Sequence, residues 1–195
     1  MTLRTLVPIL ALALACARAP APAAPRAAAA SPAEYFPLAV GNTWTYVDES
    51  PALPPERRGA TRTVRILERT ADGYFRDSDR GELRADGGCV HDRLRRLLCA
   101  PLAQGQQWSS VVSASSTERY EIAAVGETAE TPAGRFEGCV RVRAHNRAGP
   151  TTDNVLEITY APGVGPVRIE TWAVVEGNVA PQVRAVLGSY RVGGK

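Results

Sequence analysis

The sequence has little lysine, histidine or methionine. Its 195 residues include 23 basic side chains, and since Lys195 is the only lysine, the rest are arginine. The formal net charge is only +3, and charges of both signs are mixed along the chain instead of gathering into a basic block. Nucleic-acid-binding proteins usually carry such a block. The composition therefore predicts no nucleic-acid partner, and the arginine bias is typical of a GC-rich genome.

The sequence also lacks a long apolar run. The longest, residues 6–15, is about half the length of roughly 20 residues that a helix needs to cross a membrane. We therefore expect no membrane-spanning helix in the mature protein.

Motifs that carry catalysis, cofactors or metals are missing as well. There is no Gly-x-Ser-x-Gly, no Cys-x-x-Cys and no phosphate-binding Gly-Lys-Ser/Thr, and the two histidines, His91 and His145, lie far apart in the chain. Residues 77–82 begin like a calcium loop, but Gly81 comes one position early and Gly88 occupies the place of the bidentate glutamate. The sequence predicts a solvated turn there, and no catalytic, cofactor-binding or metal-binding residues.

What the N-terminus does contain is the three-part layout of a secretory signal. Arg4 precedes the apolar run 6–15, and small residues follow it. We assign residues 1–15 to a signal peptide.

Residues 12–16, Leu-Ala-Leu-Ala-Cys, resemble the lipobox of bacterial lipoproteins, with Ala13 where that pattern usually has leucine. The resemblance implies a lipid-attached Cys16, and ordinary cleavage after Ala15 or Ala17 is the alternative. A lipid on Cys16 would make the membrane a partner through the anchor. Because Ala17 stands where a retention signal would have Asp, the expected location is the outer membrane facing the periplasm, with a secreted or periplasmic protein as the alternative.

Residues 16–33 consist almost entirely of alanine, proline and arginine and predict an extended tether behind the cysteine. Residues 34–195 predict a single β domain, because apolar and polar residues alternate between recurrent glycine, proline and aspartate clusters. The predicted strands are 43–47, 61–69, 74–77, 81–85, 89–91, 94–98, 108–114, 119–125, 139–145, 154–160, 167–175 and 183–192.

Alternation also assigns faces to the strands. One face of the strand at 139–145 carries Val140, Val142 and Ala144, and one face of the strand at 154–160 carries Leu156, Ile158 and Tyr160. The fold class we expect is all-β, an antiparallel curved sheet forming a half-barrel or a sandwich, with little helix. The best helix candidate, residues 92–100, reads better as a hairpin. Residues 37–44 and 101–108 echo each other, by chance or because the sheet has two similar halves.

Three cysteines follow Cys16. A turn near Leu94 would bring Cys89 opposite Cys99, so we predict that disulfide in preference to either pairing with Cys139. Closing this loop could stabilise the fold by about 2–3 kcal/mol.

Three further segments resemble a group of exported bacterial lipoproteins that has no assigned reaction. They read Phe-Pro-Leu-x-x-Gly-Asn-x-Trp-x-Tyr at residues 36–46, Pro-Ala-Gly-x-Phe at 132–136 and Tyr-Ala-x-Gly-Val-Gly-x-Val at 160–167. The resemblance implies an envelope β domain and transfers no site residue. Each segment also has a structural explanation: Gly134 permits a tight turn that delivers Phe136 to a core, and we expect the three tryptophans, Trp44, Trp108 and Trp172, to be core anchors.

The leading functional hypothesis is a non-enzymatic, membrane-tethered binding or structural module of the cell envelope whose partner is an envelope protein. A carrier of hydrophobic ligands or lipids is the alternative, and an enzyme with carboxylate chemistry is the least favoured. An internal apolar cavity would favour the carrier, an exposed patch the binding module, and a cleft with converging carboxylates the enzyme.

Overall fold

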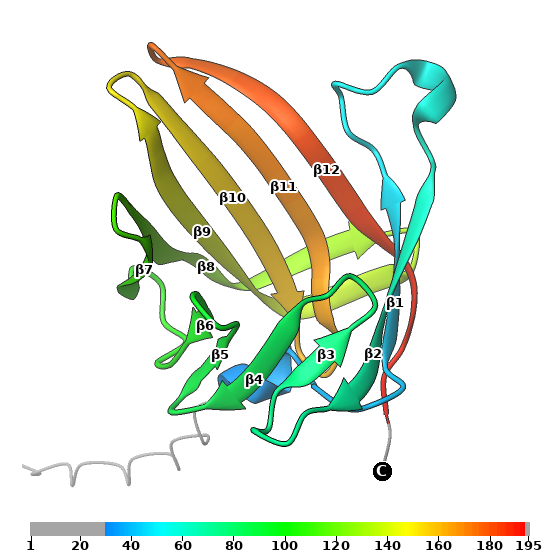
Figure 1. Ribbon diagram of the computed structural model, residues 1–195. Helices are drawn as coiled ribbons and strands as arrows, with labels where there is room; N and C mark the ends of the chain where they lie inside the picture. The colour runs from blue at the N-terminus through cyan, green and yellow to red at the C-terminus, as the bar shows by residue number, and fades with distance from the viewer. Residues whose placement is uncertain (1–29, 194–195) are drawn as a thin grey trace, which may run out of the picture.

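The computed structural model describes residues 30–193, which form one twelve-stranded antiparallel sheet (Figure 1). Each strand pairs with its chain neighbours except β6 and β7, which are the two edges of the sheet, and β1 also pairs with β12. The order across the sheet therefore runs from β6 back to β1 and then from β12 back to β7. The all-β prediction is confirmed. The elements are α1 Pro32–Tyr35, β1 Thr43–Asp48, the short 3-10 helix η1 Pro55–Arg57, β2 Thr61–Arg69, β3 Phe75–Asp77, β4 Glu82–Asp86, β5 Cys89–His91, β6 Arg96–Cys99, β7 Gln107–Ser113, β8 Ser116–Thr131, β9 Gly134–Gly149, β10 Thr152–Ala161, β11 Gly165–Val175 and β12 Asn178–Arg191.

The two edge strands, β6 and β7, meet through side chains instead of a backbone ladder. The indole Nε1 of Trp108 donates to the carbonyl of Arg96 at 2.6 Å, and the Arg96 N–H donates to the hydroxyl of Ser110 at 3.0 Å. The sheet therefore nearly closes on itself.

Every predicted strand overlaps one of the twelve observed, and β2 and β5 have the predicted bounds. The main difference is the length of β8 and β9, which have 16 residues each. Their ladder is interrupted by three register shifts between Ile122 and Ala129. Bulges of this kind bend a strand without ending it, so the hairpin continues past the point where the alternation of the sequence breaks.

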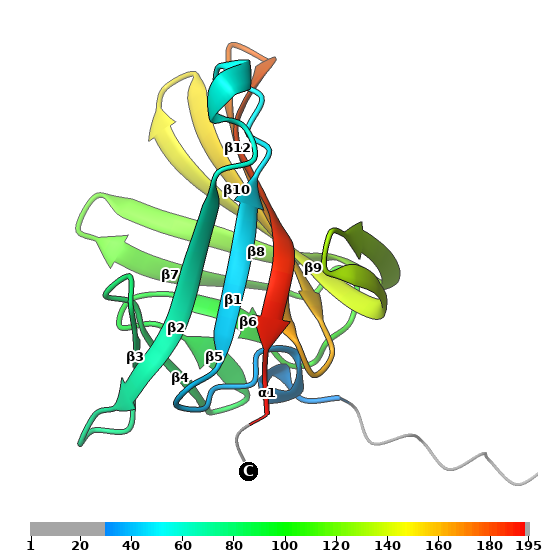
Figure 2. The ribbon, with the colours of Figure 1, turned by 90° about the vertical axis from the view of Figure 1, so that its right-hand side faces the viewer.

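The bend carries the tip of the β8–β9 hairpin to β12, beside which it projects in Figure 2. There the N–H of Ala133 donates to the carbonyl of Leu187 at 3.0 Å. Gly134 has the positive φ, +133°, that the turn requires, and Phe136 is buried against the ring of Tyr190. The Pro-Ala-Gly-x-Phe segment is thus a turn that docks one end of the sheet onto another.

The described chain begins at the lower end of the sheet. α1 starts at Pro32, which is buried, and Ser31 caps it together with Glu34. Residues 32 and 33, which we predict as the end of the tether, thus belong to this helix. The predictions for residues 1–15 and for Cys16 concern a part of the chain outside the described residues.

The two faces of the sheet differ as the alternation predicts. The core cluster lies on the inner face and includes the predicted residues Val140, Val142, Ala144 and Tyr160, with Leu156 and Ile158 packed against it. The outer face carries cross-strand ion pairs, in which Glu157 on β10 accepts from Arg141 at 3.2 Å and from Arg143 at 2.8 Å.

The first and third lipoprotein-like segments meet in the lower core. The indole Nε1 of Trp44 donates to the carbonyl of Val164 at 2.7 Å, and the hydroxyl of Tyr46 donates to the carbonyl of Pro166 at 3.0 Å. A Cβ on Gly165 would lie 3.0 Å from that indole nitrogen, so the position needs glycine for close approach as well as for its φ of +114°. These segments build a packed core.

The prediction that Trp172 is a core anchor is wrong. Thr171 lies opposite Leu156 on the inner face, so Trp172 points outward, opposite Val155. It is only partly buried, and the guanidinium of Arg143 lies 6.0 Å from its ring. The pairing of β11 with β10 is unbroken from Arg168 to Val175, so the alternation that turns Ile169 and Thr171 inward turns Trp172 outward. The size of the tryptophan side chain did not decide its direction.

Residues 37–44 and 101–108, which are similar in sequence, adopt the same turn. In each, the glycine N–H donates to the carbonyl of an isoleucine in the second strand that follows, and the N–H of that isoleucine donates to the carbonyl of the residue after the glycine. The four bonds are Gly41–Ile66, Ile66–Asn42, Gly105–Ile122 and Ile122–Gln106, all 2.9 Å. The similarity in sequence therefore corresponds to a similar local structure at the start of each six-strand half.

Strand length differs strongly around the sheet, and this difference creates an open surface. β3 to β6 have three to five residues, whereas β8 to β12 have 10 to 16. In Figure 1 the upper parts of β9 to β12 rise above the short strands. On the inner face of these strands Tyr160 and Leu187 are fully buried, whereas Val183 is 43% exposed.

Candidate functional site

The three cysteines among residues 30–193 lie in two places. Cys89 and Cys99 form a disulfide that joins β5 to β6, and Cys139 is a free thiol buried in the core. Burial raises the pKa of the Cys139 thiol, so it behaves as an apolar core residue and not as a nucleophile.

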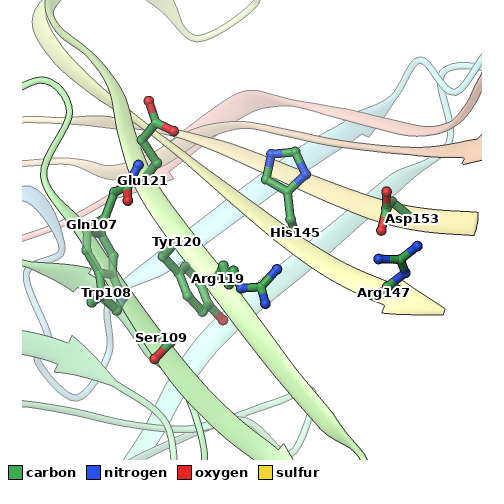
Figure 3. A pocket seen from close by; sticks show the side chains of 9 residues that line it. All are labelled: Gln107, Trp108, Ser109, Arg119, Tyr120, Glu121, His145, Arg147 and Asp153. Carbon is green, nitrogen blue, oxygen red and sulfur yellow. The ribbon is translucent and has the colours of Figure 1, made fainter. Parts of the chain in front are cut away.

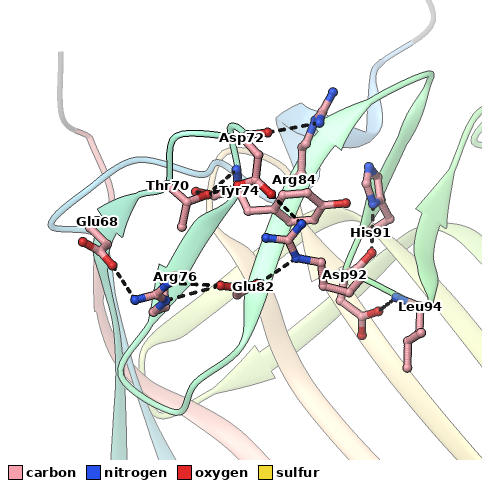
Figure 4. Close-up of polar contacts among 11 residues, drawn as sticks. Glu68, Thr70, Asp72, Tyr74, Arg76, Glu82, Arg84, His91, Asp92 and Leu94 are labelled. Atoms are coloured by element: carbon pink, nitrogen blue, oxygen red, sulfur yellow. Dashed lines mark hydrogen bonds and ion pairs between the residues drawn. The ribbon is translucent and has the colours of Figure 1, made fainter.

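His91 belongs to a polar network on β3 to β5 and the adjoining turns (Figure 4). Its Nε2 lies 2.8 Å from the Asp86 carboxylate and its Nδ1 lies 2.9 Å from the carbonyl of Asp92. Nearby, Arg93 bonds to Asp72 at 2.6 Å and to Glu82 at 2.7 Å, with its guanidinium 3.7 Å from the centre of the Tyr74 ring. The acidic and basic side chains of the network therefore pair with one another.

Hydrogen bonding within this network lowers the pKa of its carboxylic acids Asp72, Glu82 and Asp86. The bond from Arg93, together with one from Thr70, lowers the pKa of Asp72 to about 2.

No group of three or more His, Cys, Asp or Glu side chains that could hold a metal ion occurs in residues 30–193.

The calcium-like residues 77–82 form the turn between β3 and β4. The Asp77 carboxylate accepts from the backbone N–H groups of Asp79 at 2.8 Å and Gly81 at 2.7 Å. The carboxylate thus serves the backbone of its own turn.

His145 lies in an open polar cavity of about 570 Å³ on the outer face (Figure 3). Arg119, Arg147, Glu121 and Asp153 also line it. Among the described residues, none of these side chains hydrogen-bonds to another, and Arg147 donates to backbone carbonyls of the β9–β10 turn. The cavity therefore holds no assembled nucleophile and base.

The uncovered inner face is the more distinctive surface, and we call it the concave trough. One part of it is a cavity of about 240 Å³ between β1, β2, β11 and β12. Val64, Ile169, Val183 and Ala185 supply its apolar lining, and Val183 is 43% exposed. Apolar side chains that are left partly open on a concave face are typical of binding surfaces.

The other part of the concave trough is a cavity of about 400 Å³ on β8 to β12. Arg95 reaches it from the β5–β6 turn and bonds to both oxygens of Glu118, at 3.1 and 3.0 Å. The hydroxyl of Tyr120 donates to the same carboxylate at 2.5 Å, and burial together with this bond raises the pKa of Tyr120. Asn154 and Gln182 also line this cavity.

Sequence reasoning did not find these polar residues. Arg95, Glu118, Asn154 and Gln182 come from four separate parts of the chain, and only the register of the sheet brings them together. The one local signal was the alternation around Glu118, which places that carboxylate on the same face as Tyr120.

None of the helices among residues 30–193 has the length and apolar character needed to cross a membrane. No family model and no curated protein matches the chain. Among solved structures, it is similar to a putative lipoprotein from Parabacteroides distasonis, with 14% sequence identity and a TM-score of 0.44 over 80% of this chain and 98% of that one.

Proposed function

We propose that the protein is an exported, lipid-anchored component of the bacterial cell envelope whose β domain is a non-enzymatic binding module. The signal-like residues 1–15 and the cysteine at position 16 support export and anchoring. The concave trough supports binding, because it leaves apolar side chains open while the core beneath it is filled.

The position of the trough agrees with a tethered module. Both ribbon views place α1 and the last described residues at the lower end of the sheet and the β9–β10 and β11–β12 turns at the upper end (Figures 1 and 2). A domain tethered through α1 to an outer-membrane anchor would hold the upper part of the trough away from the attachment point.

The anchor is tested by Cys16→Ala. We expect the variant to move from the membrane fraction to the soluble fraction, because each buried acyl CH₂ contributes about 0.8 kcal/mol to anchoring. Arg18→Ala, which changes a neighbour and keeps Cys16, should stay in the membrane fraction. An unchanged distribution of Cys16→Ala, with no lipid mass on the wild-type protein, would remove the lipoprotein proposal.

A second candidate function is the carriage of hydrophobic ligands or lipids. The apolar lining of the 240 Å³ cavity favours it, since such a lining suits an apolar chain as well as a protein partner.

Cross-linking in cells tests binding at the trough and separates the two candidates. A photoreactive amino acid at Val183, inside the trough, should give adducts, whereas the same residue at Leu67 should not. Val183 and Leu67 are similarly exposed, at 43% and 51%, but Leu67 on β2 lines neither of the two cavities of the trough. A protein-sized adduct supports the binding module and a lipid-sized mass supports the carrier. Equal yields at both positions, or none at Val183, would contradict binding at the trough.

A further inference from the structure

The two parts of the concave trough differ in chemistry and adjoin each other. The 400 Å³ cavity combines charged and amide side chains with aliphatic ones such as Val155 and Leu156, whereas the 240 Å³ cavity is lined mainly by aliphatic side chains. They meet where Thr171, which lines the first, lies opposite Val183, which lines the second. One elongated molecule with a polar end and an apolar end can therefore occupy both.

The charges at the polar end are already matched. Arg95 bonds to both oxygens of Glu118, and its Nη1 lies 3.7 Å from Asp92. Glu118 also accepts from Tyr120. Within the cavity lining, an anionic group placed here would meet the Glu118 carboxylate and a cationic group would meet the Arg95 guanidinium. A charge of either sign would therefore lose its hydration without gaining a free partner.

The uncharged groups at the same end are available. Among residues 30–193, the side-chain amides of Asn154 and Gln182 have no hydrogen-bond partner, and both line the cavity. Each offers a carbonyl acceptor and two N–H donors. Hydroxyl groups, which both donate and accept, match amides of this kind.

The apolar end suits a flexible hydrocarbon chain. Val64, Ile169, Val183 and Ala185 form a shallow surface across β2, β11 and β12. Two charged side chains, Arg62 and Asp48, also line this cavity. Arg62 already pairs with Asp79 and lies beside the opposite charge of Asp48. This end therefore offers contact with an acyl chain and no site for a second ionic group.

We propose that the concave trough binds a single-chain amphiphile with an uncharged, hydroxyl-bearing head group. The head lies against Asn154 and Gln182, and the acyl chain crosses Val183 towards β2. This inference rests on the proposed function, in which the trough is the binding surface, and adds the class of ligand.

Calorimetry on the soluble Cys16→Ala chain tests the head group. The probes are 1-monolauroylglycerol, laurate and dodecyltrimethylammonium, whose chains have nearly the same length, each below its micelle concentration. We expect the glyceride to bind at least about tenfold more tightly than either ion, because the ions meet matched or like charges. Equal or tighter binding of laurate or of the ammonium would overturn the choice of an uncharged head, and no binding of the glyceride would overturn the ligand class.

Variants test the placement of the ligand. Val183→Asp should weaken glyceride binding about tenfold or more because it puts a charge against the acyl chain, while Val179→Asp on the same strand, 62% exposed and outside both cavities, should leave it unchanged. The pair Asn154→Ala and Gln182→Ala should weaken the glyceride and leave laurate unaffected. Equal effects of Val183→Asp and Val179→Asp would contradict the placement. The probe series itself needs no substitution in the trough, so it decides the ligand class even where a variant fails to fold.

The two proposals can fail separately. Protein-sized adducts at Val183 together with no glyceride binding would overturn the amphiphile and keep the binding module. No adducts at Val183 and no glyceride binding would overturn both.

Discussion

Replacing Trp44 with alanine should remove most of the stability of the domain. The side chain is 2% exposed, and its ring meets Phe36 edge to face with centroids 5.7 Å apart. Truncating a buried tryptophan costs about 3–5 kcal/mol. The lost indole bond would also leave the buried carbonyl of Val164 without its donor, which costs about 1–3 kcal/mol more. The sum is comparable to the whole stability of a typical domain, about 5–15 kcal/mol.

Chemical denaturation followed by circular dichroism measures this effect. Trp172→Ala is the matched control, because Trp172 is partly exposed on the outer face and should cost clearly less. Similar losses for the two variants would mean that the lower core does not depend on the contact between the first and third lipoprotein-like segments.

Phe136→Ala and Gly134→Val should both destabilise the domain, through different causes. Phe136 is 9% exposed and packs on Tyr190 with ring centroids 5.9 Å apart, so its loss leaves a cavity that costs about 3–5 kcal/mol. A Cβ at Gly134 would meet no atom within 4 Å. Valine there should therefore act through the backbone alone, at a cost of about 1–3 kcal/mol for the positive φ.

Unfolding midpoints of these variants should be compared with that of His145→Ala. His145 is exposed and has no side-chain hydrogen bond within residues 30–193, so its removal should change stability by less than about 0.5 kcal/mol. His91 does not serve as this control because both of its ring nitrogens have partners. If Phe136→Ala kept full stability but lost binding to a lipid or an envelope protein, the hairpin tip would be a recognition loop instead of a structural turn.

The strands were predictable because alternation is a local property. In β10 the residues Leu156, Ile158 and Tyr160 share a face as predicted, since a two-residue period in one strand needs no knowledge of its neighbours. The prediction failed where bulges intervene. The length of β8 and β9 depends on register shifts that arise from contacts between strands. The prediction for Trp172 failed for another reason, because it followed the type of side chain and not the alternation within β11.

The candidate site was not predictable from the chain. His91 and His145 were the titratable residues that stood out in the sequence, yet one belongs to a complete ion-pair network and the other has no partner among the described residues. Arg95 and Glu118 are separated by 23 residues and meet only because the β5–β6 turn reaches across the sheet. A salt bridge of this kind has no sequence signature.

The sequence by itself determined the antiparallel strands and the turn that needs Gly134, because each follows from alternation or from the conformational limits of single residues. It also carried the signal-like N-terminus and the placement of Cys89 opposite Cys99. Only the tertiary structure decided which apolar residues stay open. The two-residue alternation of the sequence shows on which face Ile169 and Val183 lie, but not whether another element covers that face. Here β3 to β6 are too short to reach the upper sheet. The concave trough therefore results from unequal strand lengths around one curved sheet.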